Sequence, residues 1–222
     1  MVQPSSSELT EGLSSATPPR PRHLGLLFSL LLLAVAVAAV LGYSLFARPM
    51  LVFTNRLVAP VRVILNGNVH TVTPGATVRF PLPRGQTTVA EWEMVRPLSA
   101  DGSLMGVPLR GSVVADGKRR VRHAAESRGL DADYFAPLIT NTSAAPIRMI
   151  VNAGSPDAQD CRCAVRPGAR RVFIGYYPLY RNSTVQARAA GPRTATFRDL
   201  GPQVQVPDGT IGLSFREQDL RP

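Results

Sequence analysis

The residues best suited to chemistry are Cys161 and Cys163, the only two cysteines of the chain. In a β-strand, residues two positions apart point to the same face, so their sulfur atoms would lie close together. The pair could form a disulfide in an oxidising compartment, remain as buried or free thiols, or bind a metal such as zinc or copper. His70 is the third candidate ligand, because it aligns with Cys163 in an internal repeat of the sequence. No fourth ligand is evident, so we predict neither a metal nor another cofactor.

Recognisable catalytic motifs are absent from the sequence. It has three histidines, His23, His70 and His123. There is no G-x-S-x-G turn to present a serine nucleophile, and no Walker loop, H-E-x-x-H motif or C-x-x-C-H motif. We therefore expect that the protein is not an enzyme.

The chain is strongly basic, with 25 Lys and Arg residues against 15 Asp and Glu residues and a formal net charge of +10. The arginines are scattered along the chain rather than gathered in one stripe, so we expect no nucleic-acid partner. The densest cluster is KRRVR (118–122), which follows the turn-forming pair Asp116-Gly117. This cluster is either a solvated turn or a contact for an acidic partner or anionic lipid headgroups. Its candidate contact residues are Lys118, Arg119 and Arg120.

An uncharged apolar stretch runs from Leu24 to Phe46. As a helix, its 23 residues would extend roughly 34 Å, enough to cross a hydrocarbon core of about 30 Å. The stretch is longer than the apolar core of a cleaved signal peptide, so we predict an uncleaved transmembrane helix over residues 24–46. The tail before it, residues 1–23, is rich in Ser and Pro and has no hydrophobic period.

The flanks of this stretch suggest an orientation. A short tail with two arginines precedes it, which favours a cytoplasmic N-terminus, although three arginines follow it within residues 48–62. We expect a single-pass protein of a bacterial inner membrane with its C-terminal domain in the periplasm. Small residues in the helix would let another helix approach closely. The candidate partner contacts of this region are Arg20, Arg22, Gly25 and Gly42.

The remaining sequence contains an internal repeat. TNRLVAPVRVILNG (54–67) matches TNTSAAPIRMIVNA (140–153) at an offset of 86 residues. After an insertion of seven residues, PGATVRF (74–80) matches PGARRVF (167–173). A gapped match of this kind indicates duplication of one structural unit. We predict two modules, residues 47–136 and 137–222.

Each copy has the pattern of β-strands joined by tight turns. β-Branched residues alternate with polar ones, and Asn66-Gly67 and Pro74-Gly75 mark turns. Arg62 and Arg148 occupy matching strand positions, where we expect both to face solvent. The predicted fold class is one N-terminal transmembrane α-helix followed by an all-β domain made of two repeated β-sandwich-like modules.

The turn pattern resembles that of small extracytoplasmic β-sandwich modules of the PEGA and carboxypeptidase-regulatory kind. The elements that match are Asn66-Gly67, Pro74-Gly75, the strand 77–80 and GQTTV (85–89). The resemblance implies a domain that binds or spaces other molecules and does not catalyse a reaction.

Two functions fit this plan. A single span, a polar tail and a β domain without chemistry resemble the single-span accessory subunits of bacterial photosynthetic (reaction-centre and light-harvesting) or respiratory complexes. This resemblance implies a non-catalytic scaffold subunit whose partners are membrane lipid and other membrane-protein subunits. The alternative is a free-standing, membrane-anchored envelope module that binds a polysaccharide, a lipid or a protein. The tyrosines that would serve such binding, unless they pack within the strands, are Tyr176, Tyr177 and Tyr180.

Overall fold

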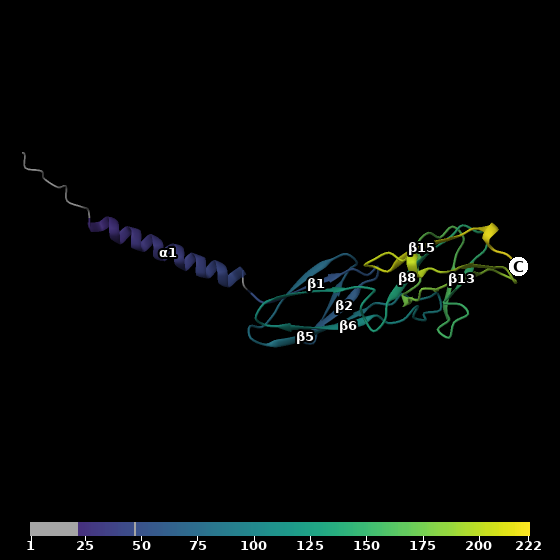
Figure 1. The fold of residues 1–222 in the computed structure, drawn as a ribbon, viewed down its shortest axis with the longest axis horizontal. Coiled ribbons are helices and arrows are strands. Elements are labelled where there is room, and N and C mark those ends of the chain that lie inside the picture. Colours follow the sequence, from purple (N-terminus) through teal and green to yellow (C-terminus); the bar gives the residue numbers. More distant parts are fainter. Residues whose placement is uncertain (1–21, 47) are drawn as a thin grey trace, which may run out of the picture. The chain divides into compact units, whose positions relative to one another are not determined.

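The computed structural model describes residues 22–46 and 48–222. The chain divides into two units, one ending at Phe46 and the other beginning at Ala47 (Figure 1). Residues 1–21 lie outside the described residues, and with them most of the predicted tail and the candidate contact Arg20.

The first unit contains the helix α1, Arg22–Phe46. Its large apolar side chains between Leu27 and Leu41 are between 50% and 68% exposed. The candidate contact Gly42 is open, because a Cβ atom added there would meet no atom within 4 Å. The candidates Arg22 and Gly25 lie in the first turns of α1. Within the described residues, no helix reaches the combination of length and mean hydropathy that a membrane span requires.

The second unit consists of β-strands with two short 3-10 helices, as the strand pattern of the sequence predicts. The strands are β1 (Met50–Asn55), β2 (Val61–Leu65), β3 (Asn68–Val72), β4 (Thr77–Pro81), β5 (Thr87–Met94), β6 (Arg110–Asp116), β7 (Arg120–Ala125), β8 (Tyr134–Asn141), β9 (Ile147–Val151), β10 (Gln159–Val165), β11 (Val172–Phe173), β12 (Tyr177–Pro178), β13 (Val185–Arg188), β14 (Thr194–Phe197) and β15 (Thr210–Phe215); the 3-10 helices are η1 (Gly201–Gln203) and η2 (Glu217–Asp219).

The first half of this unit packs two sheets face to face. One sheet has the order β4-β1-β7 and the other β3-β2-β5-β6. Strands β1 and β7 are parallel, whereas the other neighbours are antiparallel. Alternate residues of β1, β2 and β5 point inwards and are buried, because side chains of a strand alternate between its faces. Trp92 and Phe53 meet edge to face in this core, with ring centroids 6.4 Å apart.

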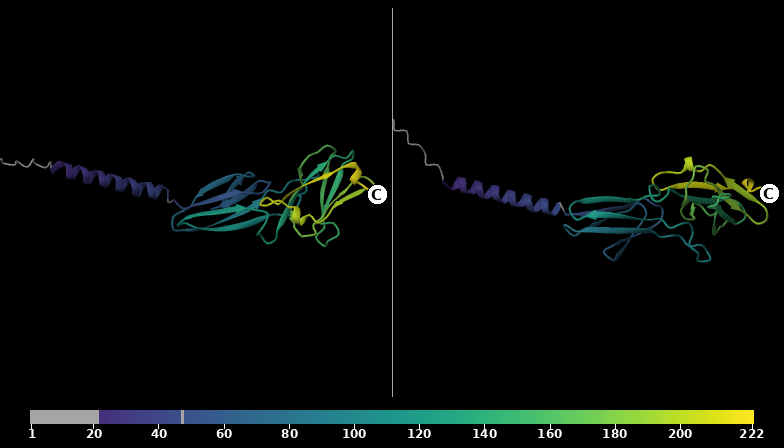
Figure 2. Two further views of the ribbon diagram at one scale, coloured as in Figure 1. Left: turned by 45° about the horizontal axis from the view of Figure 1, so that its top comes forward. Right: turned by 60° about the horizontal axis from the view of Figure 1, so that its bottom comes forward.

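The strands of the second half pair with one another in the same order as the corresponding strands of the first half. Its four-stranded sheet has the order β10-β9-β13-β14, and its other sheet places β8 between β11 and the parallel strand β15. Strand β12 also pairs with β8 and has no counterpart in the first half. Figure 2 shows the strands of the two halves occupying separate parts of the β unit, and each half has its own hydrophobic core.

Strand β8 belongs to both halves of the β unit. Tyr134 and Ala136 pack into the core of the first half, and Phe135 and Ile139 pack into the core of the second. The division predicted between residues 136 and 137 therefore falls inside one buried strand, and residues 47–222 form one compact unit. A continuous apolar run such as YFAPLI suits a strand covered on both faces.

Local sequence signals agree with the observed strands and turns. Asn66 and Gly67 have positive φ angles of 50° and 78° and join β2 directly to β3, which confirms the predicted hairpin turn. The second-half turn also begins with an asparagine at positive φ, Asn152 at 53°. Arg62 and Arg148 are both exposed in the middle of β2 and β9, as predicted.

Candidate functional site

The most distinctive surface of the β unit is cationic. Arg79 of β4 and Arg122 of β7 lie on either side of Val52 in β1, with which both are in register. Arg120 lies two residues before Arg122 on the same strand, and so on the same face of the sheet. All three arginine side chains are exposed. We call the basic face the surface formed by Arg79, Arg120 and Arg122 together with Lys118 and Arg119 of the adjoining turn.

The turn that carries Lys118 and Arg119 is fixed to a neighbouring turn by backbone contacts. Gly117 donates a hydrogen bond from its N–H to Gln86 O at 2.8 Å and accepts one from Gly85 N–H at 2.9 Å. A Cβ atom at Gly117 would lie 2.0 Å from Pro83 O. Only glycine fits this approach, so the β6–β7 and β4–β5 turns are held together at the end of the sheet where β1 begins.

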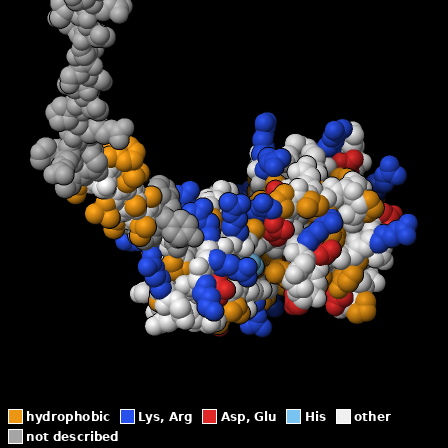
Figure 3. Space-filling model, turned by 60° about the vertical axis from the view of Figure 1, so that its left-hand side comes forward, with side chains coloured by type: hydrophobic (Ala, Val, Ile, Leu, Met, Phe, Trp, Pro, Cys, Tyr) orange, Lys and Arg blue, Asp and Glu red, His pale blue; other side chains and the backbone are white. Residues whose placement is uncertain are grey.

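Acidic residues neutralise only part of this surface. Asp116 lies 3.6 Å from Arg119, and Glu126 lies 2.6 Å from Arg56 at the other end of the sheet. Among the described residues, Arg79, Arg120, Arg122 and Lys118 have no acidic partner within ion-pair distance. Figure 3 shows Lys and Arg side chains spread over the visible face of the β unit, with several close together.

The basic face is hollowed into a shallow depression of about 450 Å³. Its floor includes Val52 and Thr54, and its walls include Arg79, Arg120 and Arg122. An arginine guanidinium presents several N–H donors in a planar fork that matches phosphate and carboxylate oxygens. The arrangement suits binding of an anionic group and contains no paired nucleophile and base.

His123 lies on the inner side of the same strand. Its Nε2 atom accepts a hydrogen bond from Trp92 Nε1–H at 3.0 Å, and its ring packs 5.7 Å from the ring of Phe53. Burial lowers the pKa of His123 below its ordinary value of 6.5, and the nearby carboxylate of Glu126 opposes this shift in part. The histidine therefore supports the basic face from below as a neutral hydrogen-bond acceptor.

Sequence reasoning found only part of the basic face. It selected Lys118, Arg119 and Arg120 because they are consecutive. Arg122 belongs to the cluster 118–122 that the sequence indicated, but it was not chosen as a contact residue. Sequence reasoning missed Arg79, because only the register of β4 on β1 brings that residue beside the cluster.

The second polar surface is a depression of about 350 Å³ in the second half. It lies among Tyr180, Asn182 and Arg198, beside the loop that follows β9. The hydroxyl of Tyr180 donates to Asp157 Oδ2 at 2.6 Å, and this side chain is 40% exposed. Tyr180 therefore remains a candidate partner contact.

The candidates Tyr176 and Tyr177 are not at the surface. They are 0% and 1% exposed, so neither can contact a partner directly, and this prediction is corrected. Tyr177 donates to Ile174 O at 2.8 Å inside the second core. Tyr176 packs in the first core, accepts a hydrogen bond from Val58 N–H at 3.2 Å and donates one to Asp208 O at 2.6 Å. Burial leaves their hydroxyls bonded within the protein, as buried tyrosines require.

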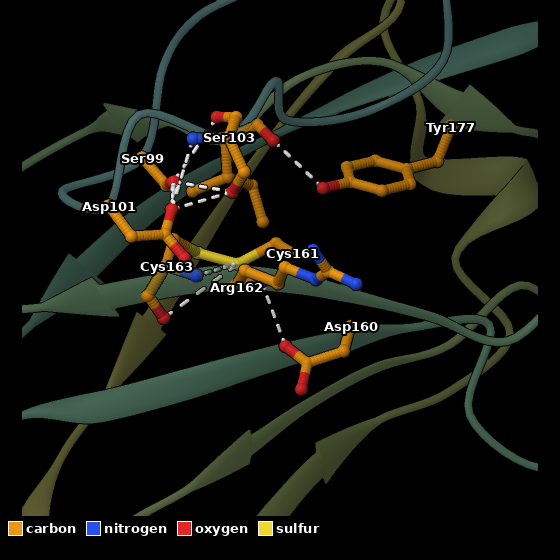
Figure 4. Close-up of a disulfide and its surroundings, with 9 residues drawn as sticks. Ser99, Asp101, Ser103, Asp160, Cys161, Arg162, Cys163 and Tyr177 are labelled. Atoms are coloured by element: carbon orange, nitrogen blue, oxygen red, sulfur yellow. Dashed lines mark hydrogen bonds between the residues drawn. A yellow bond between two sulfur atoms is a disulfide. The ribbon is translucent and has the colours of Figure 1, made fainter.

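The two cysteines form a disulfide within β10 (Figure 4). Cys161 and Cys163 are 3% and 7% exposed, and Arg162 between them has a positive φ of 52° and donates its N–H to Asp160 Oδ1 at 2.9 Å. Nearby, the hydroxyl of Ser99 and the backbone N–H and hydroxyl of Ser103 donate hydrogen bonds to Asp101. These bonds, the one from Ser99 contributing most, hold the pKa of Asp101 well below its usual range.

The metal alternative for the cysteines is therefore corrected. Both sulfur atoms are bonded to each other, and His70 packs instead on the ring of Phe80, with centroids 4.9 Å apart. Within residues 22–46 and 48–222, no group of three or more His, Cys, Asp or Glu side chains is placed to hold a metal ion. A disulfide in β10 suits an oxidising compartment.

No family model matches this chain. The search of curated protein sequences likewise finds no match.

Proposed function

We propose that the protein is a non-catalytic accessory subunit that stabilises a larger bacterial membrane complex. In this proposal α1 lies in the inner membrane, the N-terminus is cytoplasmic and the β unit is periplasmic. The uncharged sequence from Leu24 to Phe46 supports it, as do the exposed apolar side chains between Leu27 and Leu41. Such a continuous apolar surface needs lipid or another helix to cover it. The disulfide of β10 supports an oxidising compartment for the β unit.

The observation that carries this proposal is the tight junction between the halves of the β unit. Gly106 and Gly175 come into backbone contact, since a Cβ atom on Gly175 would lie 2.8 Å from Gly106 Cα. Next to them, Val107 N–H donates to Tyr176 O at 2.9 Å, and the Tyr176 side chain enters the first core. A junction with buried side chains and paired backbone groups resists bending. A stiff unit holds its surfaces at fixed positions, as a scaffold subunit requires and a loosely tethered module does not.

We also propose that the two halves are copies of one β-sandwich-like module. The repeat in the sequence, the common strand order and the parallel pairs β1–β7 and β8–β15 support this view. The turn motifs support a similarity to PEGA-like β-sandwich modules, which bind or space other molecules. We propose photosynthetic or respiratory assemblies as the candidate complexes, because the single span and the β domain resemble the plan of their single-span accessory subunits.

The alternative is a free-standing envelope module. The depression beside Tyr180 favours it, because an exposed aromatic ring surrounded by polar groups suits a sugar or a polar peptide. In that case the protein needs no fixed partner in the membrane.

Isolation from the native membrane distinguishes the two functions. The full chain, carrying an affinity tag, is extracted in mild detergent, and its native mass and absorption spectrum are measured. A scaffold subunit is recovered with one complex at constant stoichiometry. Absorption bands of a pigment or a haem then identify the class of complex. Recovery of the chain alone contradicts the scaffold proposal and supports the free-standing module.

A further inference from the structure

We infer that the basic face binds the phosphate groups of anionic lipids in the membrane that holds α1. The inference deepens the proposed function and rests on it, because it requires that the helix lies in a bilayer. It assigns a class of ligand to Arg79, Arg120 and Arg122, three exposed arginines for which we find no catalytic or structural role.

The geometry of the sheet places these arginines where their side chains can reach the same anion. Neighbouring strands lie about 4.8 Å apart, so Arg79 and Arg122 stand roughly 10 Å apart across β1. Between them Val52 provides a short apolar floor, which leaves room above it. Two long arginine side chains can converge on one phosphate placed there, and Arg120 lies two residues along β7, opposite Met50. Each guanidinium can give two parallel N–H donors to phosphate oxygens.

Position along the chain favours lipid over an acidic segment of another protein. In register, Arg120 pairs with Met50 and Arg122 with Val52, so the basic face lies at the first residues of β1. Only residues 47–49 separate β1 from the last residue of α1. Met50 and Val52, the residues that pair with Arg120 and Arg122, therefore lie only a few residues after α1 in the chain. A basic cluster beside a bilayer is attracted electrostatically to a leaflet that contains anionic lipid, over a range of about one Debye length.

The surrounding groups suit a headgroup. The depression is shallow and is lined by four arginines, by other polar side chains and by one carboxylate, that of Glu126, with no large exposed apolar residue to anchor a protein partner. Glu126 is paired with Arg56, and Asp116, outside the depression, lies beside Arg119, which leaves the central arginines to an external anion. The backbone contact of Gly117 keeps Lys118 and Arg119 at the edge of the same surface.

Arginine footprinting of the full chain in lipid nanodiscs tests this inference. One preparation contains phosphatidylcholine only and the other also contains roughly one-third phosphatidylglycerol, an anionic lipid. Both are treated with an arginine-selective dicarbonyl reagent, and labelling of each arginine is followed by mass spectrometry. We expect phosphatidylglycerol to slow labelling of Arg79, Arg120 and Arg122 at least about fivefold at low salt, and about 0.5 M salt to remove the protection.

Matched controls are available within the same chain. Arg62, Arg148 and Arg166 are exposed arginines of the β unit outside the basic face, and their labelling should not respond to phosphatidylglycerol. The triple variant Arg79→Gln/Arg120→Gln/Arg122→Gln should lose the salt-dependent retention of phosphatidylglycerol seen by native mass spectrometry. The variant Arg62→Gln/Arg148→Gln/Arg166→Gln, which changes the net charge equally, should keep it.

The outcomes separate this inference from the proposed function. Failure of the chain to enter phosphatidylcholine nanodiscs contradicts the membrane anchor itself. Entry without any effect of phosphatidylglycerol on labelling contradicts the lipid site only. Equal protection by inorganic phosphate in phosphatidylcholine discs shows that free phosphate is the ligand and overturns the assignment to lipid. Protection that appears only when a co-purified protein is added assigns the surface to a protein partner and likewise overturns it.

Discussion

Asn55 and Asn141 make the same set of hydrogen bonds in the two halves of the β unit. The Nδ2 group of Asn55 donates to Ala59 O and Val72 O, both at 2.9 Å, and its Oδ1 accepts from Leu57 N–H at 2.9 Å. Asn141 repeats these bonds with the equivalent residues, and its side chain is equally buried. Each asparagine thus closes the loop between the first two strands of its half.

We expect that Asn55→Ala and Asn141→Ala each lower the free energy of unfolding by about 2–4 kcal/mol. Each substitution leaves three backbone groups inside the protein without a hydrogen-bond partner. Urea unfolding followed by circular dichroism measures this loss. Asn182→Ala is the matched control: Asn182 is exposed, so its replacement should change stability by less than about 0.5 kcal/mol. A cost no larger than that of the control would show that these bonds do not hold the loops.

The junction glycines give a second prediction. At Gly106 an added Cβ atom would lie 2.6 Å from Tyr176 O, so Gly106→Ala forces the two halves apart. Gly129 has almost the same φ angle, 72° against 71°, but open space around it. Gly129→Ala therefore carries the backbone strain without the collision. We expect Gly106→Ala to cost about 1–3 kcal/mol more than Gly129→Ala in urea unfolding, and hydrogen exchange to rise at β8. Equal costs would falsify a tight junction.

The pair His123 and Trp92 predicts how stability depends on pH. Burial lowers the pKa of His123 in the folded state, so the unfolded state binds a proton more readily. The stabilisation from neutral His123 is fully present above the unfolded pKa of about 6.5 and is lost as pH falls from there through the lowered folded pKa. His123→Gln removes this titration and should flatten the pH dependence of urea midpoints in that window.

Trp92 is the only tryptophan, so its fluorescence reports the same event. Protonation of His123 removes the acceptor for Trp92 Nε1–H, and the emission of the wild-type protein should change over the same pH window. An unchanged emission and an unchanged stability between neutral and mildly acidic pH would contradict this role of His123.

The disulfide gives a fourth prediction. Thiol titration of the unfolded, unreduced protein should detect no free cysteine, and reduction should release two. Because Cys161 and Cys163 are two residues apart, the bond closes a very short loop. Removing the bond in Cys161→Ala/Cys163→Ala restores little entropy to the unfolded chain and should therefore cost only about 1–2 kcal/mol. Detection of free thiols without reductant would support the buried-thiol alternative instead.

Much of the β unit was predictable because its signals are local. Asn66-Gly67 can adopt the positive φ angles of a tight turn, and alternation along VRVIL sets one buried and one exposed face. These preferences depend on neighbours within a few residues, so the sequence carries them directly. The positions of Arg62 and Arg148 followed from the same alternation.

The remaining features depend on contacts between distant residues. Tyr176 lies in a segment that reads as an ordinary strand, and only packing sends its side chain into the core of the other half. Likewise β8 reads as the start of a second module, whereas the structure uses its two faces to join both cores.

By itself, the sequence determined the all-β character of residues 48–222, the hairpin turns, the outward arginines and the repeated order of motifs, because each depends on backbone preference and on the alternation of neighbouring side chains. The tertiary structure decided which surface is cationic. Arg79 and Arg122 are 43 residues apart in the chain, and only the pairing of β4 and β7 on opposite sides of β1 places both beside Val52. Strand register is a property of the assembled sheet, so a surface built across three strands exists only once the sheet has formed.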